Sequence, residues 1–544
     1  MSSTRLELVW PNKDKFLLSP QDENGKPVWV ERTHPAAREV RLAEFTEAIG
    51  QVNEERPESD NLLFVGDSLD ALRILCESPA FRREYRGKVK LIYIDPPFNT
   101  GQTFEHYDDW MEHSTWLSFM RDRLLLMKEL LSPEGSIWVH LDDVEQHRMR
   151  ALLDEIFGAN CFVANIAWEK AQGSRNDTDI SSAQDLIAIY ARDRGAWRKA
   201  RNLLPRTESQ QDRYQNPDND PRGPWRQGDN GTAKSGSEAF RYEITLPSGR
   251  IVVPPAGSYW RFSKQTFEDS RADGRVWFGR DGDSMPILKR FLSEVADGVV
   301  PRTWWPATEV GSNQEAKRDH LRKMFPGREP FATPKPERLL ERIIHIASNP
   351  GEIVMDFFAG SGSTVAAAHK MGRRWVTCEL NPSTVSDFTA ARLKLVVQGK
   401  ELGGITKSQK WSGGGGFRVI EIQDTFYAST PLGVVLTDDA AGPRFARAVA
   451  GQLGFDWHPT DGQLCGRRGR MRLAVFDGAV GVEEARQAVS ELVENERVTI
   501  VARVILPGTE EWLAENSRGS LCLKAPNDVL RERRKRRRAT GGDQ

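Results

Sequence analysis

One short turn, Asp95-Pro96-Pro97-Phe98, combines residue types that could bind and activate an amino group. It follows the apolar run VKLIYI, which predicts a β-strand, so it lies where sites form in open α/β sheets. Because prolines carry no N–H, the turn offers only acceptors, the Asp95 carboxylate and the Pro96 carbonyl. Phe98 adds a flat face on which a nucleic-acid base could stack. The alternative is a strand ended by prolines, with Phe98 packed inside.

A second turn, DFFAGSGST from Asp356 to Thr364, predicts a ligand-binding loop between a strand and a helix. Its glycines let the backbone approach a ligand, and its free N–H groups face an anion. Glu379 ends the next predicted strand, where a carboxylate can hold ribose hydroxyls. This layout is typical of a nucleoside site, although such a turn also serves tight packing alone. The GxxxxGK[ST] and GxGxxG patterns are absent, which disfavours an ATPase and a dinucleotide dehydrogenase.

These turns need a scaffold of strands and helices, which the sequence predicts on both sides of a long interruption. Apolar strand-like runs alternate with helical patterns over residues 61–170 and again over residues 331–410. Such alternation favours a mostly parallel sheet with helices on both faces. The sequence therefore predicts one sheet encoded in two halves around an insert, residues 171–330.

The insert of residues 171–330 is broken into short pieces rich in Gly, Pro, Arg and Trp. Basic residues mixed with aromatic residues suit a nucleic-acid surface. The alternative is a solvated loop region whose tryptophans belong to a core. The candidate residues for this nucleic-acid surface are Arg194, Arg198, Lys199, Arg201, Arg302 and Trp304.

The remaining segments are interpreted from composition and pattern. Residues 1–60 show no sustained period and are expected to form a loosely structured N-terminal arm. The glycine run WSGGGGF, within residues 411–420, is typical of a linker. Residues 421–530 again alternate strand-like and helix-like stretches, which predicts a separate small α/β accessory domain. Residues 531–544 form a basic tail that would add nonspecific phosphate affinity.

The composition is that of a soluble globular protein. The 544 residues carry a formal net charge of −1, and the mean hydropathy is −0.54. No apolar run is long enough to span a membrane and the N-terminus lacks a signal-peptide core, so a cytoplasmic location is expected. Scattered cysteines without a CxxC pair argue against a disulfide framework or a zinc ribbon.

One group of side chains could suggest a metal site, namely His140, Asp142, Asp143 and His147. Acids that open a helix after a strand are common caps, however, which favours a structural role over a metal site. No metal is therefore expected.

In combination, the two turns resemble those of DNA amino-methyltransferases of the β order, in which the catalytic motif precedes the S-adenosylmethionine motif. The segments GDSLDAL, LLSPEGSIWVHLDD, GRVWFGRDG and ATPKPERLLERII bring this resemblance closest to the modification subunits of type III restriction-modification systems. The resemblance implies an α/β fold: a Rossmann-like S-adenosylmethionine-dependent methyltransferase sheet with circularly permuted motif order. It also implies a target-recognition domain in the insert and a C-terminal α/β accessory domain.

The resemblance carries roles to particular residues. Asp95, Pro96, Pro97 and Phe98 match the catalytic motif, whose most frequent form ends in Tyr. Phe at that position keeps the stacking face and looks like the adenine enzymes of this branch. The residues that match cofactor-binding positions are Asp356, Phe358, Gly360, Gly362 and Thr364 in the glycine turn, Glu379 on the ribose, Asp67 near the adenine, and Lys335 in the methionine-side motif.

The implied function is methylation of the adenine N6 amino group at specific sites in double-stranded DNA, after the base is flipped out of the duplex. The resemblance also implies a homodimer and allows assembly with a helicase-nuclease restriction subunit encoded on another chain. Three alternatives stay open: an N4-cytosine methyltransferase, a noncatalytic DNA-binding or assembly subunit on the same fold, and an enzyme that acts on RNA. No motif indicates the recognition sequence.

Overall fold

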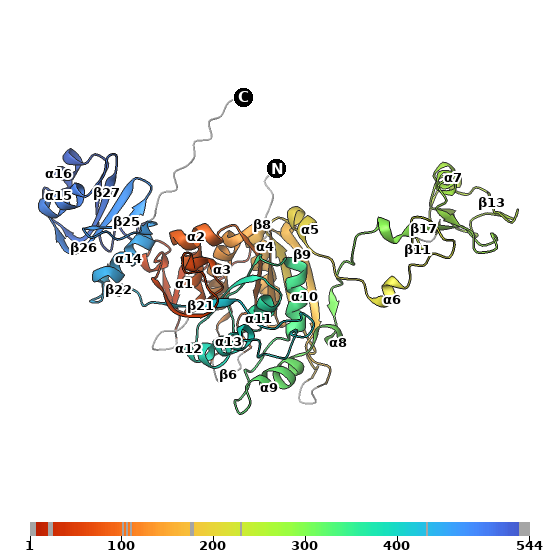
Figure 1. Cartoon of the computed structure of the whole chain (residues 1–544), viewed down its shortest axis with the longest axis horizontal. Helices are drawn as coiled ribbons and strands as arrows, with labels where there is room; N and C mark the ends of the chain where they lie inside the picture. Colours follow the sequence, from red (N-terminus) through yellow and green to blue (C-terminus); the bar gives the residue numbers. More distant parts are fainter. Residues whose placement is uncertain are drawn as a thin grey trace, which may run out of the picture. The chain divides into compact units, whose positions relative to one another are not determined.

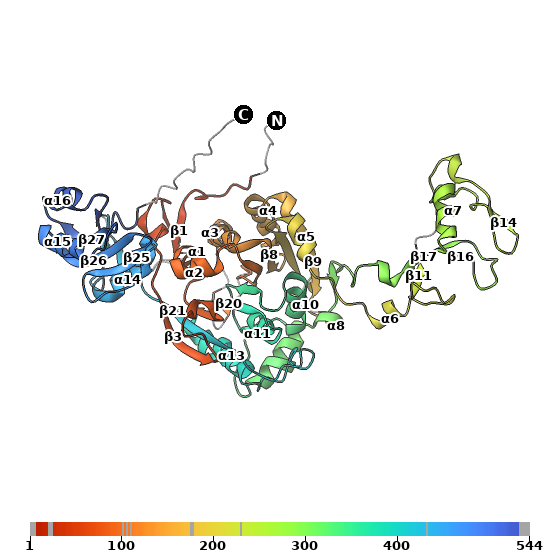
Figure 2. The ribbon, with the colours of Figure 1, turned by 45° about the horizontal axis from the view of Figure 1, so that its top comes forward.

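The computed structural model describes residues 7–19, 26–100, 103–104, 107–108, 111–174, 179–228, 231–430 and 433–531. The chain divides into two compact units. Leu203–Pro301 forms one unit, and the chain before and after it forms the other. Figures 1 and 2 show the elements of both units.

The larger unit is built on a ten-stranded mixed sheet. Its strand order is β18 (Trp304–Trp305), β9 (Phe162–Glu169), β10 (Gln184–Ala191), β8 (Leu131–Leu141), β5 (Val89–Ile94), β19 (Ile353–Asp356), β20 (Arg374–Glu379), β4 (Leu62–Val65), β21 (Gly416–Ile422) and β3 (Ala43–Gly50). The six strands from β8 to β21 run parallel, whereas β10 and β3 are antiparallel to their neighbours. This is the mixed, mostly parallel α/β sheet that the sequence predicts.

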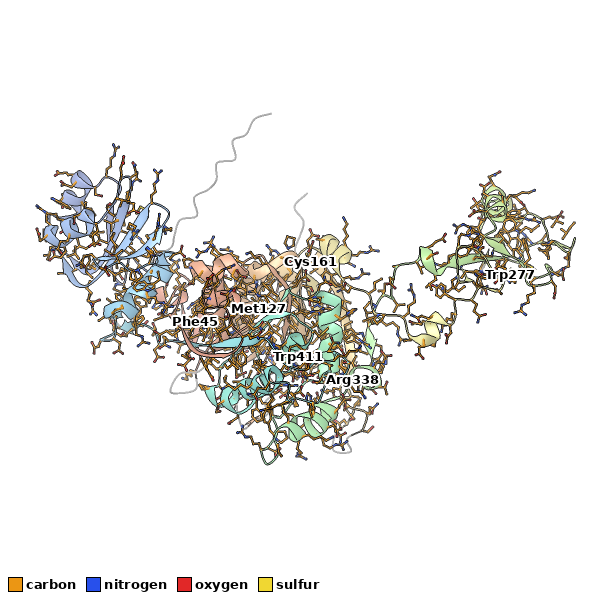
Figure 3. All side chains as sticks on the ribbon, viewed as in Figure 1. Phe45, Met127, Cys161, Trp277, Arg338 and Trp411 are labelled. Atoms are coloured by element: carbon orange, nitrogen blue, oxygen red, sulfur yellow. The ribbon has the colours of Figure 1, made fainter. Side chains whose placement is uncertain are left out.

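Helices cover both faces of the sheet. On one face, α1 (Ser68–Glu77), α3 (His113–Leu130) and α4 (Gln146–Phe157) share a core with Ile92 and Ile94 of β5; Met127 of α3 lies in this core (Figure 3). Side chains alternate along a strand, so Leu91 and Tyr93 point to the opposite face, where they are equally buried. The other helices of this part of the unit are α2 (Pro79–Tyr85), α5 (Arg194–Ala200), α8 (Ala307–Val310), α9 (Arg322–Met324), α10 (Glu337–Ala347), α11 (Ser363–Lys370), α12 (Pro382–Thr384) and α13 (Ala390–Val397), with π-helical turns at Glu315–Leu321 and Val385–Thr389.

The N-terminal region differs from the loosely structured arm predicted for residues 1–60. β1 (Phe16–Ser19) pairs with β2 (Val28–Val30), and β3 forms an edge of the large sheet. β3 is half-exposed and lacks a clean apolar alternation, and its partner β21 lies far away in the sequence. Local pattern therefore could not reveal this strand.

The glycine run also differs from the linker predicted at residues 411–420. Gly416 begins β21, and a Cβ added there would lie 2.4 Å from the backbone oxygens of Ile49 and Gln51. Glycine is thus needed at this position because two backbones approach closely, not because the chain is flexible.

The smaller unit, Leu203–Pro301, is shorter than the predicted insert of residues 171–330. The difference arises because β10, α5 and β18 belong to the large sheet and its coverings. The smaller unit contains a three-stranded sheet of β11 (Trp225–Gln227), β17 (Ile287–Phe291) and β16 (Val276–Trp277), and the helix α7 (Lys264–Ala272). Trp277 of β16 packs against Trp225 of β11, with ring centroids 5.7 Å apart (Figure 3).

Beyond β21 the chain forms a small α/β fold with two buried clusters, one wholly its own and one that also includes Leu42. Its five-stranded sheet consists of β24 (Asp456–Trp457), β25 (Leu464–Arg468), β26 (Met471–Val480), β27 (Arg497–Ile505) and β28 (Leu521–Lys524). The hairpin β22 (Tyr427–Thr430) and β23 (Gly433–Leu436) and the helices α14 (Gly442–Leu453), α15 (Val482–Ser490) and α16 (Thr509–Asn516) complete it. Of the predicted basic tail, all but Arg531 lies outside the described residues. None of the helices within the described ranges is long and apolar enough to cross a membrane.

Candidate functional site

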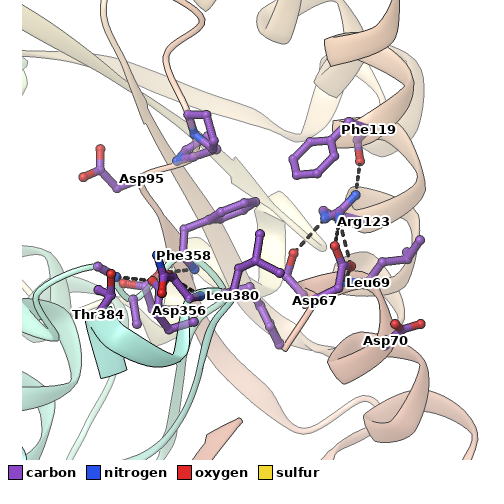
Figure 4. Close-up of a pocket in the computed structure, with 18 of the residues that line it drawn as sticks. Asp67, Leu69, Asp70, Asp95, Phe119, Arg123, Asp356, Phe358, Leu380 and Thr384 are labelled. Carbon is purple, nitrogen blue, oxygen red and sulfur yellow. Dashed lines mark hydrogen bonds and ion pairs between the residues drawn. The ribbon is translucent and has the colours of Figure 1, made fainter. Parts of the chain in front are cut away.

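A cavity of about 1210 Å³ opens at the carboxyl ends of the parallel strands (Figure 4). Sites in open α/β sheets form at this edge because the loops that follow the strands converge there. The cavity is lined by all but one of the predicted catalytic and cofactor-binding residues: Asp67, Asp95, Pro96, Pro97, Phe98, Lys335, Asp356, Phe358, Gly360, Thr364 and Glu379. Segments separated by hundreds of residues in the sequence thus meet at one place.

The predicted catalytic turn begins at Asp95, directly after β5 ends at Ile94. Asp95 Oδ2 accepts a hydrogen bond from the Lys335 ammonium at 2.5 Å. Asp95 Oδ1 is buried and has no hydrogen-bond partner among the described residues. The Pro97 carbonyl accepts a hydrogen bond from the Trp116 indole of α3 at 2.9 Å, which fixes the turn against the core. One carboxylate oxygen is therefore left for a ligand.

One face of the Phe98 ring lies against a buried histidine, His140. The rings of Phe98 and His140 are stacked, with centroids 6.1 Å apart and planes inclined by 27°. The Tyr93 hydroxyl donates to His140 Nδ1 at 2.8 Å, and His140 Nε2–H donates to Asp185 Oδ2 at 3.3 Å. Both imidazole nitrogens are thus used within the protein, which gives His140 a supporting role and leaves it no free nitrogen for a metal.

The carboxylate behind His140 is itself paired. Lys170, after β9, donates to Asp185 Oδ1 at 2.7 Å. Burial alone would raise the pKa of Asp185, but the hydrogen bond from His140 and the charges of Lys170 and Lys335 hold it at about 2. Tyr93, Lys170 and Asp185 all line the cavity and were not predicted from the sequence. For Tyr93, the sequence carries one signal of a polar role, namely a hydroxyl inside the apolar strand that precedes Asp95.

The glycine turn follows β19 and forms the opposite wall of the cavity. Asp356 is fully buried, and its Oδ1 accepts a hydrogen bond from the Phe358 N–H at 3.0 Å. Burial, together with the nearby charges of Asp95 and Glu379, raises the pKa of Asp356 to about 8. The Gly360 N–H donates to Glu379 Oε2 at 2.8 Å, which ties the turn to the end of β20.

Gly362 is the predicted cofactor residue that does not line the cavity. It has a φ of +73° immediately before α11, and a Cβ added there would lie 3.2 Å from the Thr389 methyl carbon. The structure therefore places Gly362 where the turn needs a left-handed conformation and close packing.

Asp67, between β4 and α1, is held by Arg123, a residue for which the sequence carries no signal. Arg123 Nη2 donates to Asp67 Oδ1 and Oδ2 at 2.8 and 2.7 Å, and the Leu69 N–H donates to Oδ1 at 2.6 Å. The Arg123 guanidinium lies 3.5 Å from the ring centroid of Phe119 on the same helix (Figure 4). Asp67 therefore presents a fixed, charge-paired carboxylate to the cavity.

The predicted DNA-binding residues do not line the cavity. Arg194, Arg198 and Lys199 are exposed on α5, and Arg201 follows it. β10 runs antiparallel to β8, and its last residue, Ala191, lies opposite Ser136. The cavity lies at the carboxyl end of β8. The helix α5, which follows β10, therefore lies toward the amino ends of the parallel strands, away from the cavity. Arg302 and the half-exposed Trp304 lie at the edge strand β18.

One cluster of possible metal ligands occurs among the described residues: His320, Glu337 and Glu401. Lys370 forms ion pairs with both glutamates, and Arg392 Nη2 lies 2.8 Å from Glu337 Oε1. Although burial opposes charge, Lys370 and Arg392 lower the pKa of Glu337. These acids are therefore neutralised by cations of the protein in a buried structural network.

Comparison with known proteins places this geometry in a family. Residues 89–390 match the model of a family described as DNA methylase. The chain is 32% identical over 377 residues to the Mod subunit of the type III restriction-modification enzyme StyLTI of Salmonella typhimurium, covering 62% of this chain and 55% of that protein. It is 30% identical over 301 residues to the type II methyltransferase M.EcaI of Enterobacter cloacae, covering 53% and 61%. The chain thus spans little more than half the length of these relatives.

Proposed function

Because the chain belongs to the DNA methylase family, we propose that it methylates the N6 amino group of adenine at specific sites in double-stranded DNA, with S-adenosylmethionine as the methyl donor. The observation that carries this proposal is the buried Asp95 Oδ1, an acceptor without a partner among the described residues, beside the Phe98 ring. An exocyclic amine supplies the missing donor, and its base supplies a face for Phe98 to stack on.

Asp95 would act by accepting hydrogen bonds from the target amine. The lone pair of an adenine amino nitrogen is delocalised into the ring, and hydrogen bonds to Asp95 Oδ1 and the Pro96 carbonyl would localise it on nitrogen. As the nitrogen–carbon bond forms and the sulfur–carbon bond breaks, the nitrogen loses one proton, which Asp95 Oδ1 accepts and passes to water. Catalysis then rests on positioned acceptors and needs no covalent intermediate on the protein.

The cofactor-side residues fit an adenosyl ligand that carries an amino-acid group. Glu379 and Asp67 offer carboxylate oxygens to hydroxyl and amino hydrogens, and the turn around Gly360 brings backbone close to the ligand. Lys335 offers an ammonium to a carboxylate. When bound, S-adenosylmethionine would supply an electrophilic methyl group on a sulfonium.

DNA contacts are assigned to surfaces outside the cavity. An amino group inside a duplex cannot reach Asp95, so the base has to be flipped out, at a cost of a few kcal/mol that protein contacts offset. We assign target recognition to the region of residues 171–330, which contains the compact unit Leu203–Pro301. The exposed cations of α5, with Arg302 and Trp304, are candidates for contacts to the DNA backbone.

The assembly is proposed from the relatives. Because one relative is the Mod subunit of a type III restriction-modification enzyme, we propose that this chain is a cytoplasmic modification subunit. It would work as a homodimer and join a helicase-nuclease restriction subunit on a separate chain. The small α/β fold of residues 421–530 is available for such contacts.

The first test is product analysis with a matched pair of variants. Purified wild type, Asp95→Ala and Asp143→Ala are incubated with unmethylated duplex DNA and S-adenosylmethionine, and the digested nucleosides are quantified by mass spectrometry. Asp143 is an exposed acid that does not line the cavity. We expect N6-methyladenine from wild type and Asp143→Ala and none from Asp95→Ala. N4-methylcytosine would change the base but keep the mechanism, whereas no product from wild type on DNA of varied sequence would contradict the proposal.

A further inference from the structure

Lys335 and Asp95 meet in the cavity from segments far apart in the sequence. Their Nζ–Oδ2 distance is 2.5 Å, and their side chains are 6% and 20% exposed. Lys335 stands between Pro334 and Pro336, whose rings restrict the backbone on both sides. Pro336 is the N-cap of α10, which begins at Glu337 and whose apolar face is buried. The ammonium is therefore delivered to Asp95 from a rigid backbone.

This ion pair is incomplete on both sides. An ammonium carries three N–H donors, and within the described ranges Lys335 makes one hydrogen bond, to Asp95 Oδ2. Asp95 Oδ1 is buried and lacks a donor among the same residues. Lys335 can thus still donate to an acceptor, and Asp95 Oδ1 can still accept from a donor. The carboxylate of a bound cofactor is such an acceptor, and the amino group of a target base is such a donor.

We propose that Lys335 is a positioning residue that holds Asp95 Oδ2 so that Oδ1 faces the target amino group, and that joins this carboxylate to the carboxylate of the bound cofactor. This inference rests on the proposed function and deepens it, because one ion pair then sets the positions of both reactants. A charged donor forms a stronger hydrogen bond than a neutral amine, so Lys335 determines which Asp95 oxygen remains for the base.

The position of Phe98 agrees with this role. The Lys335 ammonium lies 5.2 Å from the Phe98 ring centroid. The group that fixes Asp95 therefore also borders the ring on which the base would stack. A displaced Lys335 would disturb both the acceptor and the stacking face, although it would touch neither the target amine nor the transferred methyl group.

The first experiment measures binding without DNA or turnover. Calorimetry compares S-adenosylhomocysteine, which carries the carboxylate, with 5′-methylthioadenosine, which lacks it, on wild type, Lys335→Met and Lys323→Met. Lys323 is an exposed lysine on α9 outside the cavity. Lys335→Met is expected to weaken the binding of S-adenosylhomocysteine at least about tenfold, as for a lost charge-assisted hydrogen bond. The affinity for 5′-methylthioadenosine should change less than about twofold, because this ligand has no carboxylate to lose a contact. Equal weakening of both ligands would overturn the proposed link to the carboxylate.

The second experiment measures the single-turnover methylation rate at saturating cofactor. Lys335→Met is expected to lower this rate at least about tenfold, and Lys335→Arg to restore most of it, because the loss concerns the orientation of Asp95 and not cofactor occupancy. A loss confined to the KM for the cofactor, with an unchanged saturated rate, would overturn the positioning role.

Two controls keep the outcomes separate. If Lys335→Met does not fold, Lys335→Gln, which is polar but also removes the charge, takes its place with the same expectations. If wild type methylates no DNA, the proposed function fails, while the calorimetric comparison still decides whether Lys335 binds a ligand carboxylate.

Discussion

The His140 imidazole lies against the Phe98 ring, 6.1 Å between centroids, while Tyr93 and Asp185 hold its two nitrogens. This arrangement fixes the ring on which a target base would stack without using the two acceptors of the predicted catalytic turn, the Asp95 carboxylate and the Pro96 carbonyl. His140 is fully buried, so its rotamer is set by the protein alone. A positioned aromatic ring lowers the cost of ordering the base on binding.

We expect His140→Ala to impair both stability and methylation. The change leaves the Tyr93 hydroxyl and the Asp185 carboxylate buried without their partner, at a cost of roughly 2–5 kcal/mol in the free energy of unfolding. Urea unfolding measures this cost, and nucleoside analysis measures the methylation rate. His147→Ala, on the exposed side of α4, is the matched control. Equal stability of the two variants would show that the His140 network is not a structural support.

Asp356 predicts a pH dependence of stability. Its pKa is raised from 3.8 to about 8 in the folded protein by burial. Between these values the folded protein holds a proton that the unfolded chain has released, so the stabilisation is complete below the lower value and is lost as pH rises through the upper one. Asp356→Asn, which cannot ionise, is therefore expected to flatten the decline in unfolding free energy over this range.

The measurement is urea unfolding of cofactor-free protein at several values between about pH 5 and about pH 8. Asp143→Asn, at an exposed position, should keep the wild-type slope. A wild-type slope retained in Asp356→Asn would mean that another group is responsible.

Glu379 and Glu421 provide a matched pair for the cofactor site. Both lie opposite Val65 of β4, one at the end of β20 and one on β21, but only Glu379 lines the cavity. We expect Glu379→Ala to weaken S-adenosylhomocysteine binding about tenfold or more, since hydrogen bonds to a carboxylate are lost. Glu421→Ala should bind as wild type does. Calorimetry on both variants tests this, and comparable losses would argue against a ribose contact at Glu379.

The exposed cations of α5 predict a salt-dependent contribution to DNA binding. Replacing Arg194, Arg198 and Lys199 by Gln should weaken DNA binding and lower the slope of log affinity against log salt by up to about 0.9 per lost phosphate contact. Cofactor binding should not change, because α5 stands at the opposite edge of the sheet from the cavity. A control with the same charge change replaces three exposed arginines of the C-terminal fold: Arg486, Arg497 and Arg518. Identical salt slopes for the two triple variants would show that the cations of α5 do not contact DNA phosphates.

The buried network around Lys370 predicts a large stability effect and no metal requirement. Lys370→Met leaves Glu337 and Glu401 short of a cation, and removing one partner of a buried ion pair costs roughly 3–5 kcal/mol. Thermal unfolding measures this cost, and a chelator should leave the wild-type transition unchanged. A chelator-induced drop would falsify the reading of His320, Glu337 and Glu401 as a purely internal network.

Much of the fold was predictable because its signals are local. The apolar runs before Asp95 and Asp356 are buried parallel strands, and such strands appear in sequence as continuous apolar stretches. Edge strand β3 and the start of β21 were not predictable in this way, because each is defined by a partner more than 350 residues away. Four glycines in a row indicate flexibility by composition, whereas Gly416 serves a close backbone approach.

The sequence by itself determined which residue types stand at strand ends: an acceptor-rich turn at Asp95, a glycine turn at Asp356 and an acid at Glu379. The period of a strand and the dihedral limits of proline and glycine act over a few residues, so the chain's own order reveals them. Only the tertiary structure decided that Lys335 pairs with Asp95, that His140 supports Phe98, and that α5 lies away from the cavity. These relations depend on strand order and direction, and above all on the antiparallel return of β10, which contacts between distant segments fix.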